Sequence, residues 1–233
     1  MPLSVFAIIA AAGDSRRFGG RVRKPYVKLG RDPILVHSVR RLAKISAIRK
    51  MIILVNAEDE AMVRRRLLPG LRRHRVAEIV VGGRTRQESV QNGLAHVPPE
   101  ADLVLIHDAV RPLVREEMII ETIRAAGKIG AAILAAPVKA TLKRVGADRL
   151  IQATVPREDL WAAQTPQVFR RDLILEAYAK AKADGFWSTD DAALVEHMGR
   201  PVAIVEGDDT NIKITTREDL RAAKALLAAR GRE

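Results

Sequence analysis

The chain has 233 residues, 48% of them hydrophobic, no cysteine and a formal net charge of +12. This length and apolar content indicate a folded core rather than a disordered chain. The absence of cysteine excludes disulfides, thiolate nucleophiles and cysteine-based metal sites. The apolar runs 5–12 and 129–138 are shorter than the roughly 18 residues of a membrane span, so we expect a soluble, cytoplasmic protein without a membrane partner.

The positive charge raises nucleic acid as a possible partner. Two basic clusters stand out, at Arg64–Arg66 and Arg72–Arg75. However, aromatic residues are only 3% of the chain, so stacking platforms for bases are scarce, and no nucleic-acid motif is present. The clusters are more typical of the solvated face and end of a helix, and the excess charge suits small anionic substrates equally well.

Short strand patterns alternate with helical patterns along the chain. Strands are predicted at Val5–Ala11, Met51–Asn56, Glu78–Val81, Leu103–His107, Ala131–Pro137 and Pro201–Glu206. Helices are predicted at Ile34–Ala43, Glu58–Leu68, Arg86–Ala95, Glu116–Ala126, Asp172–Lys182, Asp190–His197 and Arg217–Ala229. This order predicts an α/β fold in which helices flank a Rossmann-like, twisted and mainly parallel sheet, in one domain over residues 1–233.

Residues 138–156 interrupt the alternation. Two strand-like runs, 141–145 and 150–155, flank the turn 146–149 and predict a β-hairpin. An isolated hairpin is marginally stable in water and needs a surface to pack on. The hairpin is therefore either an edge ribbon on its own sheet or an arm exchanged between the subunits of a dimer.

The first predicted strand breaks at Gly13 into a basic loop. Backbone N–H groups of small residues, together with Arg16, Arg17 and Lys24, would gather several positive charges beyond the strand's carboxyl end. Ligands of parallel sheets bind at that edge. The spacing fits neither a P-loop nor a G-x-G-x-x-G dinucleotide loop. The loop is either a polyphosphate site or a turn with solvated arginines.

Three other segments carry candidate site residues. Asp108 and Arg111 follow a strand at the same sheet edge, where Asp108 would hold magnesium, pair with Arg111 or cap the next turn. Lys213 lies between two isoleucines in a predicted short strand, so it points away from them, to the site or to solvent. Thr215 or Thr216 would cap the last helix, and residues 188–191 read most simply as another helix cap.

Several motifs occur together in a fixed order. They are Ala11-Ala-Gly-x-x-x-Arg17, Lys24, His107-Asp-Ala-Val-Arg-Pro112, Ala135-Ala-Pro-Val138 with Thr141, Gln164-Thr-Pro-Gln167 and Asn211-Ile-Lys-Ile-Thr215. In this order the chain resembles the 2-C-methyl-D-erythritol 4-phosphate cytidylyltransferases of the nonmevalonate isoprenoid pathway, from about Val5 to Leu227. Two alternatives are a ribitol-5-phosphate cytidylyltransferase, which shares the loop and the His-Asp-x-x-Arg-Pro motif, and a basic nucleic-acid-binding module without catalysis.

The resemblance implies a homodimeric enzyme that uses CTP and Mg²⁺, releases pyrophosphate and makes 4-diphosphocytidyl-2-C-methyl-D-erythritol. It implies catalytic roles for Arg17, Lys24, Arg157 and Lys213, and a metal-binding role for Asp108. It implies that CTP is bound by Ala11, Ala12, Gly13, Asp14, Ser15, Arg16, Gly82, Gly83, Ser89 and Asp108. The sugar phosphate would be bound by Arg111 and Thr165, and by Thr141 and Arg157 of the neighbouring subunit's arm.

Two parts of the loop depart from the family pattern. Ser15 stands where a second glycine is usual, and Arg23-Lys24-Pro25-Tyr26 stands where Pro-Lys-Gln-Tyr is usual. Pro25 removes an N–H group and biases Lys24 toward an extended backbone, while Ser15 is less free than glycine. We expect these changes to affect the geometry of the loop and the rate rather than the fold. Because the chain ends near the expected last helix, we also expect a single activity without a fused cyclase domain.

Overall fold

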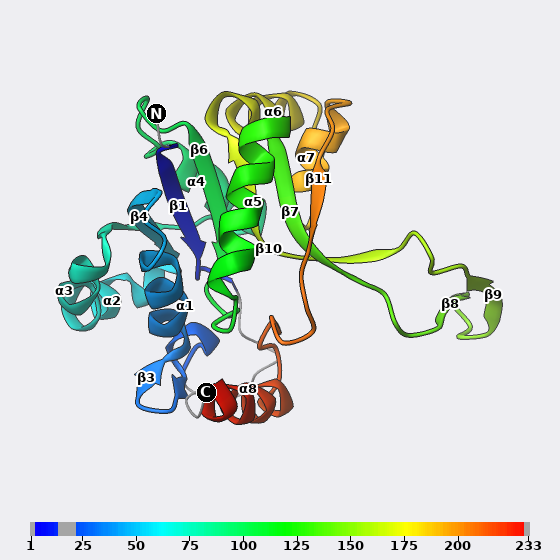
Figure 1. Ribbon diagram of the computed structural model, residues 1–233, viewed down its shortest axis with the longest axis horizontal. Coiled ribbons are helices and arrows are strands. Elements are labelled where there is room, and N and C mark those ends of the chain that lie inside the picture. The colour runs from blue at the N-terminus through cyan, green and yellow to red at the C-terminus, as the bar shows by residue number, and fades with distance from the viewer. Residues whose placement is uncertain (1–2, 14–21, 231–233) are drawn as a thin grey trace.

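A seven-stranded sheet forms the centre of the computed structural model, which describes residues 3–13 and 22–230 (Figure 1). The strand order across the sheet is β11-β7-β10-β6-β1-β4-β5. The strands are β1 (Val5–Ala10), β4 (Ile48–Val55), β5 (Val76–Val81), β6 (Leu103–Asp108), β7 (Ala131–Pro137), β10 (Trp161–Arg170) and β11 (Ala203–Glu206). All pair in parallel except β10, which is antiparallel to both β6 and β7. The predicted fold class is confirmed.

Within the seven-stranded sheet, β10 is the strand that the sequence pattern does not predict. It carries the polar segment Gln164-Thr-Pro-Gln167 in its middle, and a proline there argues against a central strand. The structure resolves this conflict with a register shift between Ala163 and Gln167, so that the intervening residues leave the ladder with β7. Polar side chains are thereby placed in the centre of the sheet, beside the end of β6.

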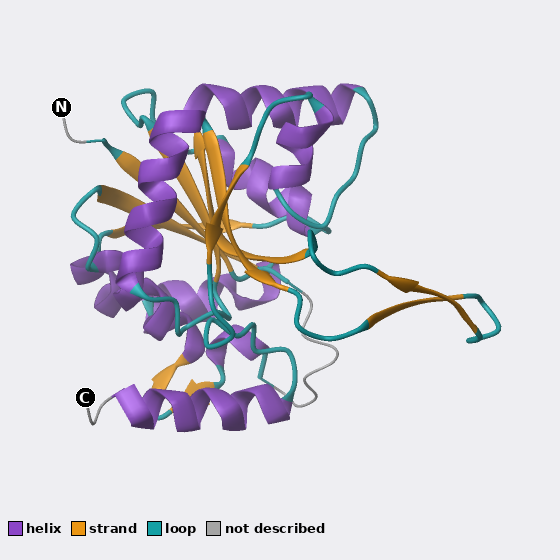
Figure 2. Ribbon diagram, turned by 45° about the vertical axis from the view of Figure 1, so that its right-hand side comes forward, coloured by secondary structure: helices purple, strands orange, loops and turns teal. Residues whose placement is uncertain are grey.

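Helices cover both faces of the sheet (Figure 2). They are α1 (Ile34–Ala43), α2 (Glu60–Arg66), α3 (Leu68–Leu71), α4 (Arg86–Leu94), α5 (Glu116–Ile129), α6 (Arg171–Ala183), α7 (Ala192–His197) and α8 (Arg217–Arg230). The helix predicted at Glu58–Leu68 is wrong in its extent, because a 3-10 turn (η3, Ala57–Asp59), α2 and α3 divide that region. Pro69, in the first turn of α3, lacks the N–H group that a continuous helix would need.

Alternating side chains of the central strands divide the core into two clusters. Ala7 and Ile9 of β1 pack with α1 and α5 on one face, while Phe6 and Ile8 pack with α4, α6 and α7 on the other. This alternation is the two-residue period of a strand, and burial on both faces is typical of parallel sheets. The sheet is therefore a rigid platform whose carboxyl edge positions the loops that follow it.

A third, smaller cluster lies beyond that edge. It joins the hairpin β2 (Lys28–Leu29) and β3 (Asp32–Pro33) to α8 through Leu29, Ile34, Val110, Ile214 and Ala223. In Figure 1, α8 lies below the sheet, beside this hairpin. This cluster fixes the segment 211–215 against the end of β6.

The predicted hairpin is present as β8 (Leu142–Val145) and β9 (Ile151–Val155), which pair with each other from Leu142 and Val155 onward. It extends away from the body of the molecule on the continuations of β7 and β10 (Figure 1). Val145, Leu150 and Ile151 are exposed on it. The alternative of an edge ribbon on the chain's own sheet is wrong, because this pair forms a separate two-stranded sheet.

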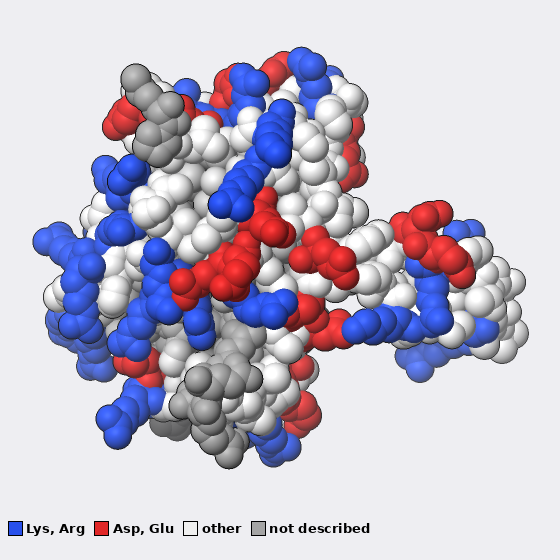
Figure 3. Space-filling model, viewed as in Figure 1, with Lys and Arg blue, Asp and Glu red and all other residues white. Residues whose placement is uncertain are grey.

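The basic clusters lie at the ends of α2 and of the 3-10 turn η4 (Arg72–His74), where blue side chains gather in Figure 3. Arg64 pairs with Glu60 at 2.8 Å, Arg65 and Arg66 are exposed, and Arg75 donates to the carbonyl oxygens of Ile45 and Ile48. This arrangement confirms the prediction of a solvated helix face and end. In the described part of the chain, none of the helices has the length and apolarity that a membrane crossing requires.

Candidate active site

A pocket of about 290 Å³ opens at the carboxyl edge of the sheet. Gly13 follows β1, Gly82 and Gly83 follow β5, and Asp108 ends β6, so three parallel strands deliver these residues to one place. The pocket is lined by Ala10, Ala11, Ala12, Gly13, Lys24, Pro25, Gly83, Arg84, Thr85, Arg86, Ser89, Asp108, Val110 and Lys213. Of the residues that the sequence singles out, it brings together the backbone after β1, Lys24, the Gly83 turn, Asp108 and Lys213.

The structure describes the basic loop up to Gly13 and again from Val22 onward. Ala11, Ala12 and Gly13 at its start and Lys24 with Pro25 at its end all line the pocket. Arg23 anchors the second of these segments by ion pairs with Glu58 and, at 3.0 Å, with Asp59. The predicted site residues Asp14, Ser15, Arg16 and Arg17 lie outside the described residues.

Pro25 stands in the one-turn 3-10 helix η2 (Lys24–Tyr26) and is buried. A proline is tolerated in the first turn of a helix, since the N–H group that it lacks would have no partner there. Lys24 begins this turn, so the expectation of an extended backbone at Lys24 is wrong. The turn is closed by the backbone N–H of Val27, which donates to the Lys24 carbonyl at 3.1 Å.

The glycine turn after β5 is packed tightly against α4. A Cβ on Gly82 would lie 2.5 Å from Cβ of Ala12 and 2.6 Å from Oγ of Ser89. Ser89 donates to the Thr85 carbonyl at 2.8 Å and accepts from the Gly83 N–H at 3.0 Å. Only residues without a side chain permit this approach. This close packing fixes the distance between the glycine turn and the loop after β1, so that the backbone of Gly83 lines the pocket at a set position.

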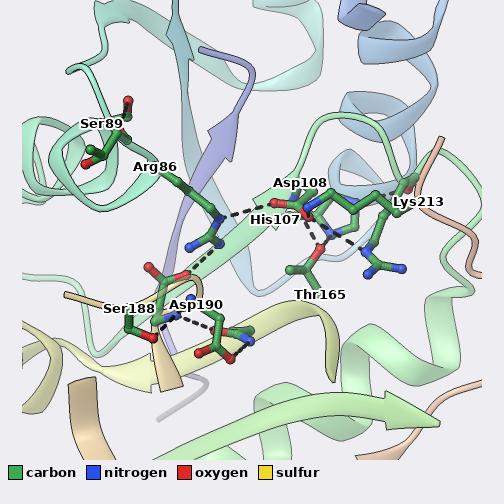
Figure 4. A network of polar contacts seen from close by, with 12 residues as sticks. Arg86, Ser89, His107, Asp108, Thr165, Ser188, Asp190 and Lys213 are labelled. Carbon is green, nitrogen blue, oxygen red and sulfur yellow. Dashed lines mark hydrogen bonds and ion pairs between the residues drawn. The ribbon is translucent and has the colours of Figure 1, made fainter. Parts of the chain in front are cut away.

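Asp108 is the anionic centre of the pocket, as Figure 4 shows. Its Oδ2 lies 2.8 Å from Nζ of Lys213 and 3.8 Å from Nε of Arg111, and its Oδ1 lies 3.5 Å from Nε of Arg86. Burial by itself would raise the pKa of Asp108, but the charges of Arg86, Lys213 and Arg111 outweigh it and hold the pKa below its usual range. Asp108 is therefore an ionised carboxylate surrounded by three cations.

Arg111 serves both the carboxylate and the backbone behind it. Its Nη1 donates to the Asn211 carbonyl at 2.7 Å, while its Nε faces Asp108 without a hydrogen-bond partner among the described residues. Burial lowers the pKa of Arg111, which the Asp108 charge partly offsets. The ion pair with Asp108, offered as the alternative to a metal site, is present in the structure.

Lys213 is confirmed to point away from its neighbouring isoleucine: Ile214 is fully buried, while Lys213 turns to Asp108. The predicted strand around it is wrong. The segment 212–215 is extended but pairs with no strand among the described residues, and is held by the Ile214 N–H, which donates to the Val110 carbonyl at 2.9 Å. Thr216 caps α8, because its Oγ1 accepts from the Asp219 N–H at 3.1 Å.

Arg86 is a central residue that the sequence analysis did not identify. It bridges two carboxylates, with Nη2 2.7 Å from Oδ2 of Asp191 and Nε facing Asp108 (Figure 4). Burial alone would lower the pKa of Arg86, but Asp191 and Asp108 raise it. The available signal was an arginine in the first turn of a predicted helix, where the helix dipole disfavours a cation. Such a placement indicates a nearby anion.

The segment 188–191 is more than a helix cap. Oδ1 of Asp190 accepts from the Ala193 N–H at 3.3 Å, so capping of α7 is confirmed there. Asp191 is instead almost fully buried, and Oδ1 accepts from the Tyr178 hydroxyl at 2.6 Å while Oδ2 meets Arg86. The α6–α7 connection thus supports the pocket from behind.

Thr141, Arg157 and Thr165 are not among the residues that line this pocket. Thr141 and Arg157 lie exposed at the base of the β8–β9 hairpin, where Arg157 donates to the Lys139 carbonyl. Thr165 is buried directly behind Asp108, and its Oγ1 accepts from the Asp108 N–H at 3.0 Å. The arrangement leaves a basic pocket with Asp108 at its centre and a separate pair of polar residues on the hairpin.

A Rossmann-like sheet with a small-residue loop after β1, two lysines that line one pocket and a buried carboxylate paired with one of them defines a nucleotide-binding α/β enzyme of the nucleotidyltransferase class. The model of the family described as IspD, 2-C-methyl-D-erythritol 4-phosphate cytidylyltransferase, matches residues 5–229. The chain belongs to this family.

Individual relatives agree with the family match. A 2-C-methyl-D-erythritol 4-phosphate cytidylyltransferase of Desulforamulus reducens is 43% identical over 227 residues, 97% of each chain. One from Geobacillus kaustophilus is 42% identical over 96% of this chain and 97% of its own. Among solved structures, the 4-diphosphocytidyl-2C-methyl-D-erythritol synthase of Anaerococcus prevotii has a TM-score of 0.84 and 33% identity, and 97% of each chain is covered. The Thermus thermophilus enzyme has a TM-score of 0.78 and 31% identity over 98% of this chain and 100% of its own.

Proposed function

We propose that this pocket carries out the reaction of its family with the residues described above. The chain is a cytidylyltransferase of the nonmevalonate isoprenoid pathway: it joins CTP to 2-C-methyl-D-erythritol 4-phosphate, giving 4-diphosphocytidyl-2-C-methyl-D-erythritol and pyrophosphate. The substrate phosphate attacks the α-phosphorus of CTP, and pyrophosphate leaves in line. No protein nucleophile is needed, so catalysis rests on positioning and on charge. The observation that carries the proposal is the ionised Asp108 among Lys213, Arg86 and Arg111 at the edge where the β1 loop begins.

The nucleotide would lie along the loop after β1 and the glycine turn after β5. Ala11, Ala12 and Gly13, with Asp14, Ser15 and Arg16, would bind the triphosphate through backbone groups and positive charge. Gly82, Gly83 and Ser89 would receive the cytosine and ribose. Small residues and backbone groups in this turn would select a pyrimidine by excluding a larger base.

Three cations would stabilise the charge that develops at the α-phosphorus. Lys24 and Lys213 both line the pocket, and Arg17 would act from the loop. Groups that meet developing charge in a desolvated site typically contribute about 3–4 kcal/mol each to the barrier. In the resting protein Lys213 is paired with Asp108, so phosphate oxygens would compete with that carboxylate for the lysine.

A magnesium ion fits the chemistry of Asp108. Mg²⁺ prefers oxygen ligands, keeps several waters and is commonly bound by one or two carboxylates together with substrate phosphates. In the described ranges, no group of three or more His, Asp or Glu side chains is placed to hold a metal ion, so the ion would arrive with the nucleotide. When bound, Mg²⁺ would neutralise phosphate charge; Asp108, already ionised, would hold it without losing a proton.

We propose further that one nucleotidyltransferase domain spans the chain and that the β8–β9 arm pairs two copies. The arm extends from the body with apolar side chains exposed, an arrangement that a partner surface would cover. Arg111 and Thr165 would contact the sugar phosphate from the main domain. Thr141 and Arg157 lie at the arm's base outside their own chain's pocket, so they would contact the sugar phosphate of the neighbouring subunit.

Pyrophosphate release tests the reaction. CTP and Mg²⁺ are supplied with 2-C-methyl-D-erythritol 4-phosphate, with ribitol 5-phosphate or with no acceptor, for the wild type, Lys24→Ala and the exposed control Lys28→Ala. We expect release with methylerythritol phosphate alone, lost in Lys24→Ala and kept in Lys28→Ala. Release with ribitol phosphate instead would change the acceptor, and no release at all would favour a nucleic-acid-binding module with salt-dependent binding.

Mixing of inactive variants tests the shared site. A Lys24→Ala subunit has a defective body and an intact arm, and an Arg157→Ala subunit has the reverse. In a mixed dimer, one of the two sites combines the intact body with the intact arm, so random mixing should restore about a quarter of the wild-type activity. Mixtures that stay inactive while exchange of subunits is demonstrated by mass would contradict contribution in trans.

A further inference from the structure

His107 is a fully buried residue of β6, directly before Asp108, and the proposed reaction gives it no role. Its Nδ1 lies 3.0 Å from Oγ1 of Thr165, and its Nε2 lies 3.1 Å from the carbonyl oxygen of Arg111. Thr165 Oγ1 in turn accepts from the Asp108 N–H at 3.0 Å. Figure 4 shows His107 next to Asp108 and Thr165.

The partners determine where the protons are. The Arg111 carbonyl can only accept, so Nε2 of His107 carries the hydrogen and donates it. A neutral ring then has a lone pair on Nδ1, and the Thr165 hydroxyl donates to it. The other polar contact of that hydroxyl in the described structure is the Asp108 N–H, which it accepts. The three hydrogen bonds therefore all point in one direction, from the Asp108 N–H through Thr165 and His107 to the Arg111 carbonyl.

The same network continues to Lys213. Nδ2 of Asn211 donates to the Thr165 carbonyl at 3.1 Å, and the Asn211 carbonyl accepts from Nη1 of Arg111 at 2.7 Å. Asn211 is fully buried and lies two residues before Lys213. Within this network, Nε of Arg111 and Oδ1 of Asn211 have no hydrogen-bond partner among the described residues. The backbone on both sides of the Asp108–Lys213 ion pair is nevertheless hydrogen-bonded from behind to groups that contact Thr165 or Arg111.

We propose that His107, in its Nε2-protonated neutral form, is a positioning residue that sets the Asp108–Arg111 turn and the direction of the Thr165 hydroxyl. Through them it holds the Asp108 carboxylate and Lys213 in the geometry that the proposed cytidylyl transfer uses, on which this inference rests. Because the hydroxyl hydrogen is already given to His107, Thr165 can meet the acceptor substrate only as a hydrogen-bond acceptor. It would accept from a sugar hydroxyl and could not donate to the phosphate.

Two substitutions at Thr165 separate positioning from packing. Thr165→Val keeps the shape and removes the hydroxyl, whereas Thr165→Ser keeps the hydroxyl and removes a methyl group. Loss of an outer-shell partner typically costs 10–100-fold in activity, so we expect Thr165→Val to lower kcat by roughly that factor. Thr165→Ser should recover most of the loss. Equal losses in both variants, or a loss confined to KM for the sugar phosphate, would overturn the positioning role.

A measurement without substrates keeps the inference distinct from the reaction itself. Nitrogen-15 NMR of histidine-labelled protein reports which ring nitrogen carries the proton, and the His107 signals are identified by their loss in His107→Gln. If that variant does not fold, single substitutions of the other four histidines identify them by elimination. We expect a protonated Nε2, an unprotonated Nδ1, and a shift of the Nδ1 resonance in Thr165→Val. A proton on Nδ1 would overturn the inference about His107 even if the enzyme is active. If the protein shows the expected tautomer but has no activity, the proposed reaction is refuted and the tautomer assignment stands.

Discussion

Lys213 Nζ and Asp108 Oδ2 lie 2.8 Å apart, although only Asp108 is buried and Lys213 is half exposed. The carboxylate has two further cations beside it, Arg86 and Arg111. The lysine side chain, in contrast, has this ion pair as its one polar contact among the described residues. The two members of the pair are therefore not equivalent. If the lysine is removed, Arg86 and Arg111 still balance the charge of Asp108, whereas Lys213 can exchange Asp108 for an incoming phosphate as its partner.

Lys213→Met should therefore reduce turnover far more than stability. We expect kcat to fall by roughly 10²–10³-fold, the usual cost of removing one group that stabilises developing charge. The free energy of unfolding should change by less than about 1 kcal/mol, because the lysine is half exposed. Steady-state kinetics and urea unfolding measure the two quantities. Lys224→Met, on the exposed face of α8, is the matched control, and a similar kcat in both variants would contradict the assignment.

Asp191→Asn should destabilise the protein because it removes one of the two carboxylates that face the half-buried Arg86. Asp191 also accepts from the Tyr178 hydroxyl, so Tyr178→Phe removes one hydrogen bond but keeps the charge. Breaking a buried ion pair typically costs about 3–5 kcal/mol, against about 1 kcal/mol for a single hydrogen bond. Urea unfolding of the two variants should show this order. Equal losses would mean that Asp108 alone suffices to compensate Arg86.

Gly82→Ala should impair nucleotide binding. The added Cβ would meet Ala12 and Ser89 at 2.5–2.6 Å, so the loop after β1 or the start of α4 must shift. We expect KM for CTP to rise by at least about tenfold, the equivalent of 1.4 kcal/mol. Gly70→Ala in α3 meets nothing within 4 Å and is the control. An unchanged KM in Gly82→Ala would show that the turn after β5 does not contact the nucleotide.

The sheet and its helices were predictable because their signals are local. The alternation of Phe6 and Ile8 with Ala7 and Ile9 records two buried faces, and the strands Ala131–Pro137 and Leu103–His107 were placed to within a residue. β10 was missed because its identity is set by its neighbours: Gln167 and Thr165 are buried by contacts with α7 and β6 rather than by apolar character. No periodicity in the sequence encodes such contacts.

The site was predictable where strands end and unpredictable where elements meet. Asp108, Gly13 and Gly83 follow from the rule that ligands bind at the carboxyl edge of a parallel sheet. Arg86 and Asp191 come from different helical regions, and only packing of α4 against the α6–α7 connection joins them. Lys24 and Lys213 line the same pocket only because of the tertiary structure. In the sequence, the order of the family motifs was the one feature that indicated this.

The buried His107 predicts an acid-sensitive fold in the substrate-free protein. Burial lowers its pKa to about 4 in the folded state, below the usual value of about 6.5. The unfolded chain therefore binds more protons between these values, and stability falls as the pH drops from 6.5 to 4, by about 3 kcal/mol in total. Below pH 4 both states are protonated and this contribution changes no further. The carboxylates with lowered pKa values, among them Asp32 and Asp219, lose their stabilising effect mainly below that window.

Urea unfolding at several pH values between 7 and 4.5 measures the slope. In the wild type the free energy of unfolding should decrease steadily across this range. His107→Gln should be less stable at pH 7 and should lose less stability on acidification; the pH dependence that remains includes that of His74, whose pKa burial also lowers. Loss of the hydrogen bonds to Thr165 and Arg111 accounts for the lower starting point. A wild-type stability that stays level from pH 7 to 4.5 would mean that the ring becomes charged without unfolding, which its enclosure between Thr165 and the Arg111 carbonyl opposes.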